Sequence, residues 1–385
     1  MKNKFLLTFL FMFIFGSIDA FQTANELEKI KNSIALKLDS IYNKDTDFGG
    51  ATIGVVLPEG QVLSFALGYV NEAKTIKMQP NARMLGGSTG KIFVSAAIMQ
   101  LVATKKLSLD AKIMDYLGEF AWFTKIQNHE SITVRHLMQH SSGISRYVYA
   151  PQFQIDIHKN ADKQWTPKEL LTYVFDAKPL FEAGTSFAYA DTNYIILAMV
   201  LEKVAKTSMY DYVQKNVLDP FNLKTVSPQI SRMIPGLVAG YNAPNDPLFP
   251  GAVLENGNYK YNVQFEWAGG GFVENATDLA KAGKLIYEGA MFSKSLLSDF
   301  FNGIEAKGLG GTWGLGVHIR NTPMGMTYGH SGFFPGYISN MLYYPDHKFA
   351  IAIQVNTSDA KKLSLYRKLF QVVPTIQREL SAIKN

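Results

Sequence analysis

The sequence predicts an α+β (α/β) fold in which an antiparallel sheet, built from both ends of the chain and flanked by helices, carries an inserted, mainly helical lobe. Strand-like runs occur near the start and again in the last fifth of the chain, and helical patterns fill the region between them. The 385 residues are 47% hydrophobic and 18% charged, which indicates a globular protein with a sizeable core. We expect one domain over residues 21–385, with a sheet lobe at about 21–118 and 278–385 and a helical lobe at about 119–277.

The chain begins with the pattern of a secretory leader. Lys2 and Lys4 precede an apolar run over residues 5–18, which is shorter than the roughly 20 residues needed to span a bilayer. We therefore expect residues 1–20 to be a signal peptide. The predicted location of the protein is outside the cytoplasm, either periplasmic or secreted, with no stable membrane span.

The first elements after this leader are a helix and a hairpin. Residues 25–42 repeat leucine and isoleucine at helical spacing, which predicts an amphipathic helix. Residues 51–57 and 62–67 predict two strands joined by the turn Pro58-Glu59-Gly60. Residues 93–102 are almost continuously apolar, so they predict a helix that is buried on all sides.

Helices are predicted for the middle of the chain and strands for its end. Residues 166–175 and 193–204 have helical patterns, separated by polar and Pro/Gly-rich connections. Three later runs have strand character, at residues 313–319, 337–344 and 349–355, and Pro345-Asp346-His347 forms the turn between the last two. Residues 363–383 predict a closing helix that Pro374 kinks or divides.

Composition excludes several classes of function. The chain has no cysteine, which rules out disulfides and a thiolate nucleophile. Its net charge of +6 is spread along the sequence, so we expect no binding to nucleic acid. No metal ligand set and no cofactor motif is recognised.

The most informative motif is Gly86-Gly87-Ser88-Thr89-Gly90-Lys91, where a serine and a lysine are three residues apart. Side chains at this spacing meet on one face of a helix, so Ser88 is a candidate nucleophile and Lys91 a candidate base partner. Two other S-x-x-K copies lie in or next to the closing helix, where a solvated face explains them: Ser358 with Lys361, and Ser381 with Lys384. The first copy differs because glycines precede it and a buried helix follows it.

The same residues also match G-x-S-x-G, the nucleophile elbow of α/β-hydrolases. That motif requires a hydrophobic strand directly before it. Residues 79–85 contain a proline and polar side chains, which disfavours a central strand there. The elbow interpretation is therefore weaker than the helical serine and lysine.

Five stretches in order resemble the serine β-lactamase and penicillin-binding DD-peptidase superfamily, in the branch of class C β-lactamases, related carboxypeptidases and esterases. They are residues 88–91 (S-T-G-K), 133–143 (T-V-R-H-L-M-Q-H-S-S-G), 189–194 (Y-A-D-T-N-Y), 268–271 (A-G-G-G) and 329–332 (G-H-S-G). The resemblance covers nearly all of the chain after the leader. It implies a β-lactamase-like fold and a reaction through an acyl-enzyme.

The resemblance also implies roles for individual residues. Ser88 would be the nucleophile and Lys91 its partner, and Tyr189 would exchange protons with Ser88 and the leaving group. His330-Ser331-Gly332 resembles the family's K-T-G element, with the backbone N–H groups of Ser88 and Phe333 forming the oxyanion hole. Because a histidine is mostly neutral at pH 7, His330 would bind a substrate carboxylate more weakly than lysine does, which argues against a dedicated penicillinase.

Asp191 departs from the family pattern, because it stands where asparagine is usual. An ionised carboxylate accepts hydrogen bonds but donates none, so its contact with a substrate amide carbonyl would be impaired. Alternatively, Asp191 holds Lys91 in its charged form, which would favour Tyr189 as the base. If the carboxylate only impairs contact with the substrate, Asp191→Asn raises amide turnover.

Four of these features also have an interpretation that involves no role in the reaction. Residues 140–143 read as a helix end with a glycine cap, and Gly269-Gly270-Gly271 as a site of close backbone approach. Tyr189 could also be a core tyrosine, and His330 a strand histidine outside the reaction.

The function predicted from sequence is that of an exported serine hydrolase acting on a D-amino-acid peptide, a β-lactam or a small ester. A cell-wall peptide is the expected natural substrate, given the predicted location. The alternative is a non-catalytic sensor of penicillin or muropeptides, whose serine is acylated without turnover. Deacylation distinguishes the two.

Overall fold

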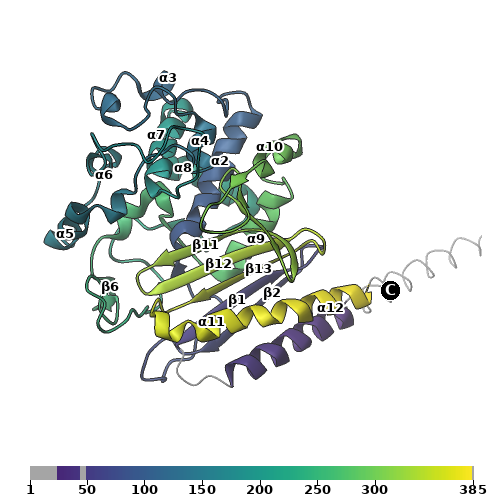
Figure 1. Ribbon diagram of the computed structural model, residues 1–385. Coiled ribbons are helices and arrows are strands. Elements are labelled where there is room, and N and C mark those ends of the chain that lie inside the picture. The colour runs from purple at the N-terminus through teal and green to yellow at the C-terminus, as the bar shows by residue number, and fades with distance from the viewer. Residues whose placement is uncertain (1–23, 44–48, 384–385) are drawn as a thin grey trace, which may run out of the picture. The chain divides into compact units, whose positions relative to one another are not determined.

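The computed structural model of the protein describes residues 24–43 and 49–383 (Figure 1). Two compact units can be recognised: one contains residues 24–43 and 367–383, and the other contains residues 49–366. The predicted signal peptide lies outside the described residues, as does Lys384 of the last S-x-x-K copy. Of the helices that are described, none has the length and apolar character needed to cross a membrane.

The smaller unit consists of helices from the two ends of the chain. Residues 24–42 form the predicted N-terminal helix. The closing helical pattern is divided, as expected near Pro374: α11 (Ser364–Leu369), whose first three residues belong to the larger unit, and α12 (Val373–Ile383) are separated by the single turn η9 (Phe370–Val372). Lys29 and Glu379 form an ion pair of 3.9 Å within this unit.

The larger unit contains an eight-stranded antiparallel sheet in the order β2-β1-β13-β12-β11-β10-β9-β8. Its strands are β1 (Gly50–Val56), β2 (Val62–Gly68), β8 (Ile304–Glu305), β9 (Thr312–Trp313), β10 (His318–Thr322), β11 (Gly325–Phe334), β12 (Tyr337–Tyr344) and β13 (Phe349–Val355). Because β1 pairs with β13 along six residues, the two ends of the sequence meet in the middle of one sheet. The predicted α+β architecture is therefore confirmed.

One predicted strand was wrong. Residues 313–319 do not form a continuous strand, because the chain reverses between β9 and β10. The amide of Gly314 donates to the carbonyl of Val317 at 2.8 Å, and Gly316 has a φ of +84°, a backbone conformation that favours glycine. The two glycines inside an apolar run were the local signal for this tight turn.

The hydrophobic core of the larger unit contains residues of both the sheet and the helices. Figure 1 shows how these helices lie beside the sheet. Helix α2 (Lys91–Ala103) is buried almost throughout, as its continuous apolar sequence predicted, and α7 (Asp191–Ala205) packs against it. Helix α9 (Ala276–Tyr287) lies against β1, β12 and β13. The remaining helices are α3 (Met114–Leu117), α4 (Val134–Met138), α5 (Pro151–Lys159), α6 (Pro167–Thr172), α8 (Met209–Val213) and α10 (Leu297–Phe301).

Two small sheets complete the larger unit. Strands β3 (Met84–Leu85), β7 (Phe272–Glu274) and β4 (Ser227–Pro228) pair in the order β3-β7-β4, and β5 (Leu254–Glu255) pairs with β6 (Asn258–Tyr259). The first of these sheets matters for the site, because β3 leads directly into the turn that carries Ser88. Strand β3 is only two residues long, so the long strand that a nucleophile elbow requires does not precede Ser88.

Candidate active site

Ser88 lies in the single turn η1 (Gly87–Gly90), directly before α2. The hydroxyl of Thr89 closes this turn by donating to the carbonyl of Gly86 at 2.9 Å and lies 3.2 Å from a carboxyl oxygen of Glu274 on β7. The turn is thereby anchored to the strand beneath it. The helix then places Lys91 one turn after Ser88, as the sequence spacing predicted.

Three backbone segments meet closely around Ser88, and glycines make this possible. A Cβ on Gly87, whose φ is +54°, would lie 2.4 Å from the carbonyl oxygen of Phe333, and a Cβ on Gly332 would lie 1.9 Å from that of Gly86. Strand β11 therefore runs directly past the serine turn. This arrangement brings together the backbone of Ser88 and that of Phe333, whose amides are the predicted oxyanion donors.

The predicted close approach of residues 269–271 is present at Gly270. A Cβ there would lie 2.2 Å from the carbonyl oxygen of Gly87 and 2.9 Å from the amide nitrogen of Ser88, and φ is +142°. Gly270 follows η6 (Val263–Gly269), in which Trp267 has the strained values φ 39° and ψ −121°. Strain of this kind in a non-glycine residue is typical of functional sites.

Lys91 is completely buried and uses each of its three N–H groups. Its Nζ lies 3.1 Å from Ser88 Oγ and 2.7 Å from Asp191 Oδ1, and it also donates to the carbonyl of Gly269. Burial alone would lower the pKa of Lys91, but Asp191, Tyr189 and Glu266 together outweigh it, so the pKa is raised. Lys91 is therefore an ammonium that donates to Ser88.

Asp191 bridges two cations at the start of α7. Arg146 donates to its Oδ2 from Nε at 3.0 Å and from a terminal nitrogen at 2.6 Å, while Oδ1 faces Lys91. Although burial opposes ionisation, Lys91 and Arg146 together hold the pKa of Asp191 well below its usual range. The hydroxyl of Thr192 accepts from the amide of Tyr147 at 3.1 Å, which fixes Arg146 beside the helix.

Sequence reasoning missed Arg146. One signal was available, because a carboxylate in a family position normally held by a neutral amide requires compensating charge. Lys91 was the only cation considered for it, and nothing in the local spacing connects residue 146 with residue 191.

Tyr189 lies beside this charged group. Lys91 Nζ is 5.1 Å and the guanidinium carbon of Arg146 is 5.3 Å from the centre of its ring. Burial raises the pKa of Tyr189, while Lys91 and the nearby Ser88 hydroxyl oppose the rise. Its hydroxyl is buried and lies near Ser88 and Lys91, but it meets the geometry of a hydrogen bond with no residue between 49 and 383. The predicted nucleophile, its lysine partner and the predicted proton carrier are thus brought together.

The predicted His330-Ser331-Gly332 element lies on β11. Successive side chains of this strand point alternately to its buried and its exposed face. His330 is 2% exposed and contacts the carbonyl of Ser331 through Nδ1 at 2.7 Å, whereas Ser331 and Phe333 are exposed. Burial, aided by Lys91, lowers the pKa of His330 to about 3. The imidazole is therefore neutral at pH 7 and offers no positive charge to a substrate carboxylate.

The glycine-cap interpretation of residues 140–143 needs correction. Helix α4 ends at Met138 and is capped by Gln139, and the left-handed residue that follows is His140, with a φ of 55°. Gly143 lies further on, where a Cβ would be 2.1 Å from the carbonyl oxygen of Phe181. His140 is fully buried and packs against Tyr189, with ring centres 4.1 Å apart and ring planes inclined at 35°. The motif therefore brings a histidine to the site.

Two buried glutamates near the site were also missed. Burial and the charge of Asp191 raise the pKa of Glu266 to about 8, and burial raises that of Glu274 to about 8. One carboxyl oxygen of Glu274 lies 3.2 Å from the Thr89 hydroxyl and accepts from the side-chain amide of Gln354 at 3.4 Å, and the other has no partner among residues 49–383. Glu274 thus supports the serine turn as a neutral acid at pH 7.

Glu274→Gln is expected to reduce the pH dependence of stability. The folded protein binds the Glu274 proton more tightly than the unfolded chain does, so this group stabilises the fold at low pH and loses its contribution as pH rises from about 4.5 to about 8. A shift of this size corresponds to at most about 5 kcal/mol. Urea denaturation at pH 6 and pH 9 should show a smaller loss of unfolding free energy in the variant.

The control for this experiment is Glu130→Gln, whose side chain is 82% exposed. Its stability curve should parallel that of the wild type, since an exposed carboxyl gains little on folding. A Glu274→Gln curve that also parallels the wild type would show that Glu274 is ionised in the folded protein.

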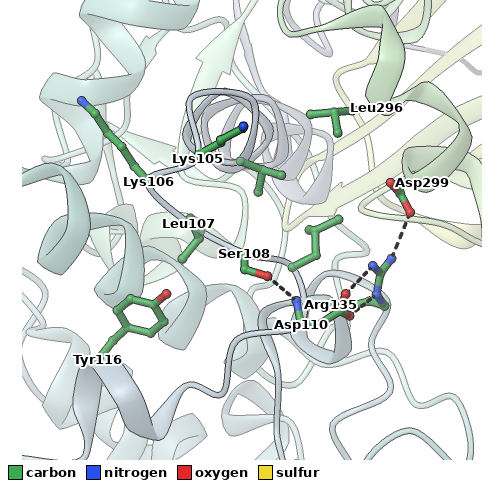
Figure 2. Close-up of a pocket in the computed structure, with 11 residues that line it drawn as sticks. Lys105, Lys106, Leu107, Ser108, Asp110, Tyr116, Arg135, Leu296 and Asp299 are labelled. Atoms are coloured by element: carbon green, nitrogen blue, oxygen red, sulfur yellow. Dashed lines mark hydrogen bonds and ion pairs between the residues drawn. The ribbon is translucent and has the colours of Figure 1, made fainter.

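A separate cavity of about 560 Å³ lies at the other end of α2 (Figure 2). Its lining includes Lys105, Lys106 and Tyr116, together with Arg135, which pairs with Asp110 and Asp299. Helical rise places this end roughly 16 Å from Lys91. None of the residues predicted for the active site lines this cavity.

Comparisons with known proteins agree with this geometry. The family model described as Beta-lactamase matches residues 37–372. The chain belongs to the beta-lactamase family. Among similar proteins, penicillin-binding protein 4* of Bacillus subtilis (strain 168) is 25% identical over 293 residues, which cover 74% of this chain and 62% of that protein. Protein flp of Staphylococcus aureus (strain MW2) is 25% identical over 199 residues, covering 51% of this chain and 39% of its own length. The match thus spans less than two thirds of either relative.

Solved structures show that the fold recurs in other proteins. The D-amino acid amidase from Ochrobactrum anthropi SV3, complexed with L-phenylalanine amide, has a TM-score of 0.77 at 19% identity, covering 93% of this chain and all of that one (100%). A D-stereospecific amidohydrolase from Streptomyces has a TM-score of 0.72 at 22% identity, covering 88% of this chain and 98% of that one. The predicted superfamily and its fold are confirmed.

Proposed function

We propose that this member of the beta-lactamase family is an exported serine hydrolase that forms an acyl-enzyme on Ser88. Its substrates would be amides, peptides or esters of D-amino acids, with a cell-wall peptide as a natural source. No metal or cofactor takes part in the proposed reaction.

The observation that carries this proposal is the hydrogen bonding of Lys91. Its three N–H groups face Ser88 Oγ, Asp191 and the carbonyl of Gly269, so Lys91 is fully protonated and cannot accept the proton of Ser88. The serine hydroxyl is left to donate toward Tyr189. Tyr189 is therefore the proposed base, and Lys91 stabilises its phenolate through charge.

The proposed reaction then has two halves. Tyr189 takes the hydroxyl proton of Ser88 as Oγ attacks the substrate carbonyl, and the amides of Ser88 and Phe333 stabilise the oxyanion. Tyr189 next gives its proton to the leaving nitrogen or oxygen, which leaves an ester on Ser88. Tyr189 then takes a proton from a water molecule, whose oxygen attacks the ester carbonyl. The bond between the acyl carbon and Ser88 Oγ breaks, and Tyr189 returns the proton to Oγ as the acid product leaves.

The surroundings of Ser88 favour a substrate without a free carboxylate next to the scissile bond. His330 is neutral, and both guanidinium contacts of Arg146 to Asp191 are already formed. The exposed side chains near the site include Phe333 and Tyr149, which are 57% and 65% exposed and offer apolar contacts. The fold neighbours that act on D-amino acid derivatives, named above, support amides over β-lactams.

Ser88→Ala is expected to abolish both covalent labelling and turnover. The assay is labelling by a fluorophosphonate and a fluorescent penicillin, with turnover of a D-amino-acid amide, p-nitrophenyl esters, a D-Ala-D-Ala peptide and nitrocefin. The matched control is Ser358→Ala in the second S-x-x-K copy, where the hydroxyl bonds only Gly336 and Asn242 among the described residues. This variant should label and turn over normally.

Each outcome has a clear meaning. Equal labelling of Ser88→Ala and wild type would show that Ser88 is not the nucleophile. A label that persists on the wild type while none of the substrates is consumed would favour the sensor. Faster turnover of the D-Ala-D-Ala peptide than of the amide would contradict the proposed preference for uncharged substrates.

A further inference from the structure

Tyr189 belongs to a group of four buried rings, which we call the Tyr189 ring cluster: His140, Tyr189, Trp313 and His330. The ring centre of His140 lies 4.1 Å from that of Tyr189 and 5.3 Å from that of Trp313. Trp313 also lies 5.3 Å from Tyr189 and 5.2 Å from His330. The cluster joins three segments far apart in sequence to the proposed base.

Each ring of this cluster has one buried polar atom without a partner among residues 49–383. These atoms are His140 Nε2, Tyr189 Oη, Trp313 Nε1 and His330 Nε2. Buried polar atoms are nearly always hydrogen-bonded, because leaving one unpaired is costly. Each of these rings contacts at least two of the others, so the four atoms point to a shared bound partner.

The protonation state of His140 follows from its neighbours. Its Nδ1 lies 3.3 Å from the amide of Ala190 and 3.1 Å from the side-chain nitrogen of Asn193. The amide orientation of Asn193 is set by Ser142, whose hydroxyl donates to Asn193 Oδ1. Since Nδ1 receives two donors, it carries no proton, and the neutral ring presents Nε2–H.

His330 has the opposite arrangement. Its Nδ1 lies 2.7 Å from the carbonyl oxygen of Ser331, so Nδ1 carries the proton and Nε2 is a bare acceptor. Trp313 can only donate, through Nε1–H, and the oxygen of Tyr189 can accept. The Tyr189 ring cluster thus offers two donors and two acceptors.

We propose that the Tyr189 ring cluster binds one water molecule, which makes His140 and Trp313 positioning residues for Tyr189. A water molecule has two acceptor and two donor directions, and buried waters commonly make two to four hydrogen bonds to groups that are otherwise unpaired. It would accept from His140 and Trp313 and donate to His330 and Tyr189. This inference rests on the proposed function for its catalytic consequence.

That consequence concerns the base. A hydrogen bond donated to the phenolate oxygen favours the ionised form of Tyr189 and fixes the direction of its free electron pairs toward Ser88. The charged groups that face Tyr189 are Lys91 on α2, Asp191 on α7 and Arg146 before α5. The water would add its hydrogen bond to the effect of these charges, and it would contact Tyr189 from the side of the Tyr189 ring cluster.

Two variants remove single donors while keeping the fold. Trp313→Phe keeps an aromatic ring and loses Nε1–H. His140→Asn keeps an acceptor near Nδ1 and suits the left-handed backbone at this position, which asparagine tolerates well. The matched control is Phe187→Leu, because the Phe187 ring packs on His140 and Trp313 and has no polar atom.

The test has two readouts. A high-resolution crystal structure of the wild type should show an ordered water in contact with all four polar atoms, whether or not Ser88 reacts. In the rate of Ser88 acylation against pH, Trp313→Phe and His140→Asn should shift the rising limb upward by about one pH unit and slow acylation about tenfold at pH 7. Phe187→Leu should leave the limb in place, and KM should change little.

Several results would overturn the water site. They are the absence of ordered density among the four atoms, donor variants whose pH profiles coincide with the wild type, or an equal shift in Phe187→Leu, which would assign the effect to packing. If Ser88 is never acylated, the proposed function fails, and the crystal structure alone decides the water site.

Discussion

Asp191→Asn will slow acylation of Ser88 by about 100-fold and destabilise the fold by about 3 kcal/mol. The carboxylate lies between Lys91 and Arg146 and is 3% exposed, so its removal leaves a buried lysine and a partly buried arginine close together without a counter-charge. Lys91 would then lose its proton more readily, and the charge that stabilises the phenolate of Tyr189 would weaken. Fluorophosphonate labelling rates and urea denaturation measure the two effects.

A matched control is Asp110→Asn, which also breaks an Asp–Arg pair. Arg135 donates to Asp110 at 2.7 and 3.1 Å, but the side chain of Asp110 is 70% exposed. Exposed pairs of this kind contribute about 1 kcal/mol or less, so labelling should be unchanged. A rise in amide turnover for Asp191→Asn would instead mean that the carboxylate is only a handicap in the place of asparagine.

Gly270→Ala is expected to reduce labelling of Ser88 by about 100-fold, because a displacement of about 1 Å at a reacting group can have that effect. The new Cβ would overlap the carbonyl oxygen of Gly87 at 2.2 Å and press on the amide of Ser88 at 2.9 Å, and both are backbone atoms that cannot rotate away. The serine turn must therefore move. Overpacking and an unfavourable φ should together lower stability by about 3 kcal/mol.

The control Gly60→Ala separates the effect of overpacking from that of the unfavourable φ. Gly60 also has a positive φ, of +91°, but an added Cβ there would have no neighbour within 4 Å. This control should lose about 1 kcal/mol from backbone strain and keep the wild-type labelling rate. Wild-type labelling of Gly270→Ala would show that the backbone around Ser88 can relax.

Much of the fold could be predicted because its signals are local. The hairpin β1–β2 and strands β12 and β13 follow from short apolar runs between turn residues, and α2 follows from a continuous apolar run of helical length. The prediction failed at residues 313–319, where two glycines reverse the chain inside an apolar run. There the turn depended on backbone conformations that hydrophobicity does not encode.

The sequence by itself determined the pairing of Ser88 with Lys91, because a helix brings side chains three residues apart together whatever surrounds it. Only the tertiary structure decided the protonation and the hydrogen bonds of that pair. The partners of Lys91 are 100 and 178 residues away, at Asp191 and Gly269, and Arg146 reaches Asp191 from a different segment. His140 likewise meets Tyr189 across α4 and α7. The burial, charge and protonation of site residues depend on which distant segments of the chain come into contact. Local sequence spacing does not encode those contacts.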